Sequence, residues 1–321
     1  MNSEYPIVSA VIPTRNRPGL VVRAVASALE QTFAQLEVIV VVDGPDQATL
    51  NALAEIGDAR LRVIALDESV GGAEARNTGA RAANGKWIAL LDDDDEWLPT
   101  KIEKQLQMAK GCGINRVVVV SQYLERTPAR LDVVRPRRLP LAGEPICEYM
   151  FDFLCYFQTS TFFCSRELFL EIPFRKELKS FQDIDWFLRV NSDPSVRCLV
   201  IAESLSVYHS PDQRATITSK LDWKKRLAWG QENRKLMTRR AYSRFIVGSC
   251  AGTAARDQTG GRTSALVKLT TECLLHGSPT PVTIGFLFGT FLVTPSTRRT
   301  IRDSLFLRTG DSSIEPVGLH T

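Results

Sequence analysis

The stretch WIALLDDDDEWLP, residues 87–99, joins five apolar residues directly to four consecutive aspartates. A short apolar run bounded by polar residues is typical of a strand buried on both faces of a sheet. Adjacent carboxylates repel one another, so stability alone does not favour the acidic run. A divalent cation such as Mg²⁺ or Mn²⁺ would relieve this repulsion, because it prefers oxygen ligands and leaves positions for phosphate oxygens. The alternative is that the acids cap a helix that begins near Pro99.

Four other apolar, β-branched segments predict further strands, at residues 7–12, 37–42, 61–66 and 117–121. The segments between them place apolar residues at helical spacing, as in Leu20, Ala24 and Ala28. Alternation of strands and helices implies right-handed βαβ units. We therefore predict an α/β fold with a Rossmann-like, mostly parallel sheet flanked by helices.

The loops that follow three of these strands are polar. They span residues 13–17, 43–46 and 92–96, and the last two are acidic. Ligands of open α/β sheets bind at the carboxyl ends of the strands, which locates the predicted site in these loops.

Four stretches carry a resemblance to a known family: VSAVIPTRNRP (8–18), LEVIVVVDGPD (36–46), GGAEARNTGARAANGKWIALLDDDDEWLPTKIEKQ (71–105) and FQDIDWFLRV (181–190). Together and in this order, they resemble the family 2 glycosyltransferases of the GT-A fold. The resemblance implies an inverting, metal-dependent transfer of a sugar from a nucleotide-diphosphate donor to an acceptor hydroxyl. It also implies a role in polysaccharide or glycoconjugate biosynthesis.

The resemblance assigns the metal site to the acidic run. Alignment through Trp97 and Pro99 makes Asp94 the ligand of Mg²⁺ or Mn²⁺, with Asp92 and Asp93 holding the ribose or the water shell of the metal. His209 lies where some members place a histidine that binds the metal or the diphosphate. A lone histidine is also common as a plain surface residue.

The donor site is assigned in the same way. The resemblance pairs Asp43 with the nucleobase and places Arg76 near the donor, while Pro13, Thr14 and Arg15 form the first donor-contact loop. Asp43 would otherwise be a turn former in DGPD, and Arg76 a charge on a surface helix. The expected donor is a UDP-, GDP- or dTDP-sugar.

Asp183 is the residue expected to act as general base, because an inverting transfer needs a carboxylate that takes the proton of the acceptor hydroxyl. The alternative is that Asp183 only caps a helix. The family usually has an acid before the base, whereas this chain has Gln182. Asp185 is therefore a second candidate, although it points to a different face of the helix.

The last third of the chain differs in charge from the rest. Residues 1–210 hold 23 Lys and Arg against 28 Asp and Glu, a balance of −5, and the remaining residues balance at +9. We predict a catalytic domain over residues 1–215 and a basic helical region over residues 216–321. The basic region is interpreted either as a solvated surface or as a surface that meets anionic lipid or an anionic acceptor.

Features of the whole sequence suggest a cytoplasmic protein, with a peripheral position at the inner face of the membrane as the alternative. The seven cysteines are scattered without a CxxC pair, which fits a reducing compartment. The N-terminus does not resemble a signal peptide. The apolar stretch 282–293 is too short to span a bilayer, so we expect a buried helix or, flanked by Arg298, Arg299 and Arg302, an interfacial one.

Other classes of protein remain as alternatives. An aspartyl phosphotransferase also has acids after a parallel strand, but Thr or Val would be expected where Glu96 and Trp97 stand. Residues 13–16 lack the GxGxxG turn of dinucleotide-binding proteins, and the chain has no GxxxxGK[ST] stretch. A non-catalytic nucleotide-sugar sensor would keep the donor residues and lose the base. No nucleic-acid partner is expected; the acceptor is expected to be a saccharide or a lipid-linked sugar.

Overall fold

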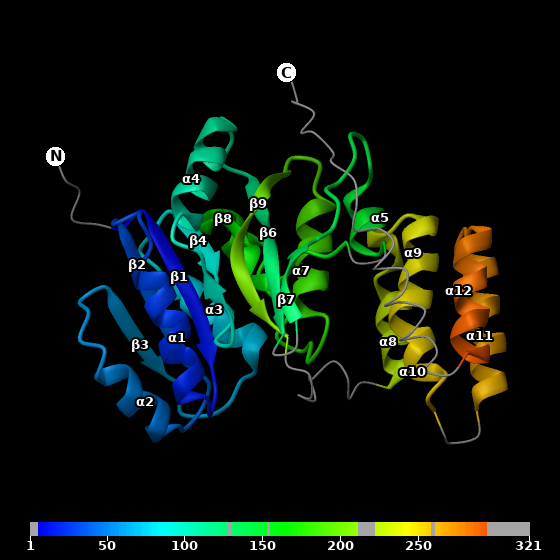
Figure 1. Cartoon of the computed structure of the whole chain (residues 1–321), viewed down its shortest axis with the longest axis horizontal. Coiled ribbons are helices and arrows are strands. Elements are labelled where there is room, and N and C mark those ends of the chain that lie inside the picture. Colours follow the sequence, from blue (N-terminus) through cyan, green and yellow to red (C-terminus); the bar gives the residue numbers. More distant parts are fainter. Residues whose placement is uncertain (1–5, 128–129, 153–154, 211–221, 258–260, 294–321) are drawn as a thin grey trace. The chain divides into compact units, whose positions relative to one another are not determined.

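The computed structural model describes residues 6–127, 130–152, 155–210, 222–257 and 261–293 (Figure 1). The chain divides into two compact units, residues 1–221 (unit 1) and residues 222–321 (unit 2). The domain boundary predicted at residue 215 lies outside the described residues.

One mixed sheet organises unit 1, in the order β3-β2-β1-β4-β8-β6-β9-β5, with β7 paired to β6 (Figure 1). The strands are β1 (Val8–Thr14), β2 (Leu36–Val42), β3 (Leu61–Ala65), β4 (Trp87–Leu90), β5 (Glu96–Trp97), β6 (Val117–Thr127), β7 (Arg130–Arg135), β8 (Phe163–Ser165) and β9 (Arg197–His209).

The directions of the strands bring several carboxyl ends to one edge. Strand β1 pairs in parallel with β2 and β4. Strand β8 is antiparallel to both β4 and β6, so β6 runs in the same direction as β4, and β9 is parallel to β6. The carboxyl ends of β1, β2, β4 and β9 therefore share the edge where ligands of such sheets bind.

Helices cover both faces of the sheet, because the apolar residues of its strands alternate between two cores. The first core contains helices α1 (Pro18–Leu29), α2 (Gln47–Ala54) and α4 (Lys101–Gly111). The second contains α3 (Gly72–Ala82), α5 (Ile146–Met150), α6 (Arg166–Glu171) and α7 (Gln182–Asn191). All seven residues of β1 and of β2 are buried, as expected for strands between two helical layers.

The predicted fold class is confirmed, with two local differences. Strand β3 is at the edge of the sheet and is partly exposed, although a strand buried on both faces was expected. Residues 130–135, for which no strand was predicted, form β7, which pairs antiparallel with the end of the long strand β6. The resulting sheet is parallel from β3 to β4 and mixed beyond it.

Unit 2 is helical in its described residues, as predicted. It contains α8 (Trp223–Glu232), η3 (Arg234–Leu236), α9 (Arg239–Phe245), a π-helical segment η4 (Ile246–Ala251), α10 (Gly252–Ala254), α11 (Arg262–His276) and α12 (Pro281–Leu292). Its core includes Trp229, Phe245 and Leu269. The rings of Trp229 and Phe245 are 5.3 Å apart between their centroids.

The apolar stretch predicted at residues 282–293 forms most of α12, but only one side of this helix is buried. Thr283, Leu287 and Phe291 face the interior, whereas Val282 is 67% exposed and Leu292 78% exposed. The expectation of a fully buried helix is therefore wrong. The three flanking arginines lie outside the described residues.

Within the part of the chain that the structure describes, none of the helices has the length and apolar character needed to cross a bilayer. The seven cysteines are free thiols.

Candidate active site

A pocket of about 540 Å³ lies at the carboxyl ends of β1, β2, β4 and β9. Residues that are far apart in the sequence meet in it. All ten residues predicted for the site line this pocket: Pro13, Thr14, Arg15, Asp43, Arg76, Asp92, Asp93, Asp94, Asp183 and His209. Their roles remain predictions; what the structure shows is their common location.

The four aspartates of the acidic run have different surroundings. Asp92, Asp93 and Asp94 line the pocket, whereas Asp95 is 1% exposed and does not. The run does not cap a helix, because α4 begins at Lys101 and its capping residue is Thr100.

Arginines neutralise the part of the run that faces the pocket. Arg76 forms an ion pair with Asp92. The Nη1 atom of Arg17 lies 2.8 Å from Oδ1 of Asp93 and 3.1 Å from Oδ2 of Asp94. The hydroxyl of Thr14 also donates to Asp93, at 2.8 Å. Burial nevertheless raises the pKa of Asp93 above its ordinary value.

Asp95 is buried beside the pocket and links the segments that form it. Its carboxyl accepts hydrogen bonds from Gln158 and from the hydroxyl of Ser160, the latter at 2.6 Å, and from the backbone N–H of His209 at 3.3 Å. Burial raises its pKa well above the ordinary value, and the charges of Asp92 and Asp94 add to the effect. The sequence did not separate Asp95 from its neighbours, since nothing in DDDD shows which carboxyl turns inward.

Asp43 binds the loop that precedes α3. Its carboxylate accepts from the backbone N–H groups of Val70 at 2.6 Å and Gly71 at 3.1 Å, and from the hydroxyl of Ser69 at 2.9 Å. Arg15 also donates to Ser69, at 2.7 Å. Asp43 is thus more than a turn former: it fixes one wall of the pocket.

Asp183 lies in the first turn of α7. It is not the helix cap, since the capping residue is Phe181, whose φ of 61° is left-handed. Oδ1 accepts from the backbone N–H of Ile184 at 2.8 Å, and Oδ2 accepts from the hydroxyl of Tyr156. The pKa of Asp183 is raised to about 6, chiefly by burial; the negative charge of Asp92 contributes to the rise, while the N–H of Ile184 and the charge of Arg76 oppose it.

The second candidate for the base, Asp185, faces away from the pocket. It is fully buried and forms ion pairs with Arg175 at 3.0 Å and Arg189 at 2.7 Å. Each of its two carboxyl oxygens is engaged by a guanidinium, and Asp185 is not among the residues that line the pocket. Asp183 is therefore the only one of the two that can meet a ligand in the pocket.

The pocket also contains residues that the sequence did not single out. Arg17 lies in a loop already predicted to form the site, although no role was given to it. Phe181 begins the stretch 181–190 that carries the resemblance, but no role was given to it. Tyr156 does not line the pocket itself; it reaches Asp183 from a segment with no recognisable pattern, and its position depends on packing between distant elements.

The acidic residues that face the pocket suit a hard cation only if the ligand supplies further oxygens. In the described ranges, no three His, Cys, Asp or Glu side chains are grouped to hold a metal. Mg²⁺ commonly binds through one or two carboxylates together with substrate phosphates, and the partly exposed carboxylate of Asp94 meets this requirement. His209 Nε2 lies 2.5 Å from Glu96, so it would have to exchange this partner for a metal.

The fold and the pocket define the GT-A class of glycosyltransferase-like α/β proteins. A similar solved structure is the mannosyltransferase PcManGT from Pyrobaculum calidifontis, in complex with GDP-Man and Mn²⁺. It matches with a TM-score of 0.51 at 16% identity, over 95% of this chain and 81% of that chain. At this identity the match concerns the fold alone.

The chain belongs to glycosyl transferase family 2, whose model matches residues 9–173. It is 42% identical over 110 residues to the succinoglycan biosynthesis protein ExoO of Rhizobium meliloti, covering 34% of this chain and 32% of that protein. It is 29% identical over 210 residues to the amylovoran biosynthesis glycosyltransferase AmsB of Erwinia amylovora, covering 63% and 69%. The chain thus matches only about a third of ExoO. The chain is therefore a member of a glycosyl transferase family, and these two relatives act in the biosynthesis of succinoglycan and amylovoran.

Proposed function

We propose that the protein transfers a sugar from a UDP-, GDP- or dTDP-sugar to an acceptor hydroxyl, with inversion and with the help of Mg²⁺ or Mn²⁺. One observation carries the proposal: the pocket places an acidic run next to a second carboxyl, Asp183, whose pKa of about 6 suits a general base. A group with this pKa is ionised at neutral pH and still accepts a proton readily.

The donor would lie along the carboxyl ends of β1, β2 and β4. The wall fixed by Asp43 would receive the nucleobase, and the 13–15 loop would contact the nucleoside. Asp92 and Asp93 would hold the ribose or ordered water, and Asp94, with His209 as a second candidate, would hold the cation. When bound, such an ion neutralises charge on the diphosphate. The Mn²⁺ in the PcManGT complex supports this choice of cation.

In the proposed reaction, the Asp183 carboxylate accepts the proton of the acceptor hydroxyl. The hydroxyl oxygen forms a bond to the anomeric carbon while the bond from that carbon to the diphosphate oxygen breaks. The nucleoside diphosphate leaves with the bonding electrons. Attack on the face opposite the leaving group inverts the anomeric configuration.

The acceptor is proposed to be a saccharide or a lipid-linked saccharide. The basic composition of residues 211–321 favours a site of action close to a membrane, at its inner face for a cytoplasmic protein.

The first test is hydrolysis of the donor in the absence of an acceptor. Purified protein with Mn²⁺ should slowly release nucleoside diphosphate from at least one member of a panel of nucleotide sugars. Tight donor binding without release, with every saccharide acceptor tried, would instead support a nucleotide-sugar sensor. The observation that favours a sensor is Gln182, which stands where the family usually has an acid.

A further inference from the structure

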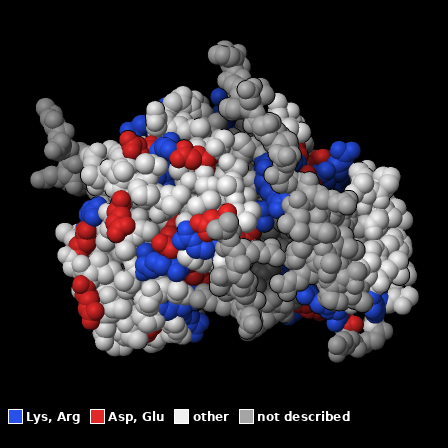
Figure 2. All heavy atoms as spheres, viewed as in Figure 1, with Lys and Arg blue, Asp and Glu red and all other residues white. Residues whose placement is uncertain are grey.

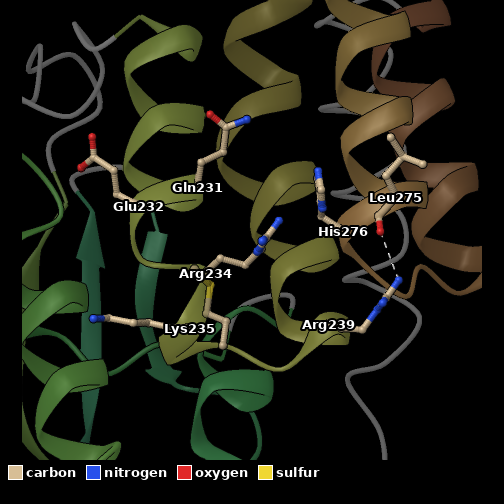
Figure 3. Close-up of a pocket in the computed structure, with 8 residues that line it drawn as sticks. Gln231, Glu232, Arg234, Lys235, Arg239, Leu275 and His276 are labelled. Carbon is tan, nitrogen blue, oxygen red and sulfur yellow. Dashed lines mark hydrogen bonds between the residues drawn. The ribbon is translucent and has the colours of Figure 1, made fainter.

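A second pocket lies entirely within unit 2, outside the residues matched by the family model (Figure 3). It encloses about 490 Å³ between the end of α8, η3, the start of α9 and the end of α11. Its lining includes three side chains with a permanent positive charge, Arg234, Lys235 and Arg239, against one carboxylate, Glu232. The pocket is therefore basic.

The charged groups of this pocket differ in whether they can bind a ligand. Arg239 donates to the carbonyl oxygens of Gly277 at 2.9 Å and Leu275 at 3.3 Å, so it is part of the wall. Among the described residues, the side chain of Arg234 forms no hydrogen bond or ion pair, and Figure 3 shows its guanidinium on the same side as Gln231 and His276. Lys235 points away from them in that view. Arg234 is thus placed to meet a ligand.

A carboxylate that contacts the lining residue Gln231 already has two hydrogen-bond donors. Glu272 accepts from Gln231 at 3.0 Å and from the hydroxyl of Tyr242 at 2.7 Å. Glu272 forms no ion pair with Arg234, and the Arg234 guanidinium therefore has no counter-ion among the described residues. A guanidinium in this situation suits a phosphate group, which it can bind through two parallel hydrogen bonds.

Exposed apolar residues adjoin the basic pocket. Leu275 lines it and is 64% exposed, and its neighbour Leu274 is 58% exposed. Helix α12, which begins five residues after the end of α11, has no charged residue and exposes Val282, Phe286 and Leu292. In Figure 2, most of the visible surface over α11 and α12 is white, with basic residues near its lower end.

We propose that unit 2 binds the surface of an anionic membrane, with the phosphate of one lipid headgroup in this pocket. Arg234 contacts the phosphate, and His276 and Gln231 supply further hydrogen bonds. Leu274, Leu275 and the exposed side of α12 enter the region between headgroups and acyl chains. A basic site next to apolar side chains matches the two components of such a surface, its negative charge and its hydrocarbon. The proposal does not depend on the identity of the donor or of the base.

The test is co-sedimentation of the full chain with vesicles of phosphatidylcholine, with or without an anionic phospholipid. We expect binding to the anionic vesicles only. The double variant Arg234→Gln/Lys235→Gln should bind about 20- to 30-fold more weakly, since each Lys or Arg near an anionic surface contributes about fivefold. The control Lys224→Gln/Lys225→Gln removes the same charge from the exposed side of α8, outside the pocket. Equal losses in the two double variants would overturn the pocket assignment.

A second comparison separates lipid from soluble phosphate. Leu274→Gln/Leu275→Gln should weaken binding to the anionic vesicles and leave binding of inorganic phosphate unchanged. Binding of inorganic phosphate by the unmodified chain, without any binding to anionic vesicles, would overturn the assignment of a lipid. Circular dichroism of each variant should show an unchanged helical content, because all the substituted side chains are exposed.

Discussion

Gln182 accepts a hydrogen bond from Arg76, with 3.1 Å between Oε1 and Nη1. Arg76 also forms the ion pair with Asp92, so one guanidinium connects the acidic run to the first turn of α7. Gly72 lies against the same pair, since a Cβ at this position would be 3.2 Å from Nη1 of Arg76. The residue that departs from the family pattern is therefore part of the pocket's charge arrangement.

Gln182→Glu should move the pH dependence of transfer to higher pH. A carboxylate next to Asp183 disfavours ionisation of that residue, although Arg76 neutralises part of the added charge. We expect the acid limb of kcat/KM to rise by up to about one pH unit. The control Gln107→Glu adds the same charge on the exposed side of α4 and should leave the profile unchanged. An unshifted profile in Gln182→Glu would show that Gln182 has no electrostatic influence on the base.

Asp183→Asn should lower the rate of transfer by about a hundred- to ten-thousand-fold, the usual contribution of a general base. The amide is close to the carboxyl in shape and can still accept from Tyr156, so donor affinity should persist. Titration with the donor and measurement of single-turnover transfer separate the two effects. Transfer at the original rate would remove Asp183 from the role of base.

The unmodified enzyme should gain activity as the pH rises through about 6. Burial places the pKa of Asp183 at about 6, and only its ionised form accepts a proton. Below this pH the carboxyl is protonated and transfer should decline about tenfold for each unit. A pH profile of kcat/KM that is flat between pH 5 and pH 7 would contradict the assignment.

Asp94→Ala should abolish the dependence of donor binding on Mn²⁺ and lower transfer by about two orders of magnitude or more. The control Asp67→Asn removes a carboxylate from the exposed loop after β3 and should keep both properties. Calorimetric titration of donor with and without Mn²⁺ is the measurement. If Asp94→Ala still binds the donor more tightly with Mn²⁺ than without it, the cation is held by other residues.

Gly79→Ala should destabilise unit 1 by about 1–3 kcal/mol, because the added methyl group has no room. Gly79 is buried in α3, and a Cβ there would collide with Val11 of β1. Gly111→Ala is the control at the end of α4, where a Cβ meets nothing within 4 Å. Denaturant unfolding gives both free energies. Because α3 carries Arg76, Gly79→Ala should also weaken donor binding.

Much of the fold could be predicted from hydrophobic periodicity, and the exceptions have physical causes. The strands of the parallel half are short apolar runs between polar loops, and such runs can be recognised from the local sequence alone. The exposure of β3 depends on its edge position, which is decided by strand order. Likewise, α12 has no charged residue, so its composition does not tell which side packs against the rest of unit 2.

For the pocket, the sequence indicated the loops but not the contacts. The carboxyl-end rule located residues 13–17, 43–46 and 92–96, and the resemblance added Asp183. Tyr156 could not be found in this way, because its hydroxyl reaches Asp183 only through the packing of a segment without regular structure. The choice between Asp183 and Asp185 also required the structure, since it depends on the arginines that surround Asp185.

The inward position of Asp95 changes how mutations in the acidic run should be interpreted. Its carboxyl joins the loop after β4 to Ser160 and to the end of β9, so its loss would loosen three segments at once. An alanine scan scored by activity alone would rank Asp95 together with Asp94, although one would fail by misfolding and the other by losing a ligand. The four identical neighbours are therefore under two different selective pressures, one for ligand binding and one for protein stability. Natural variation at position 95 should depend on what keeps the protein folded, whichever donor it uses.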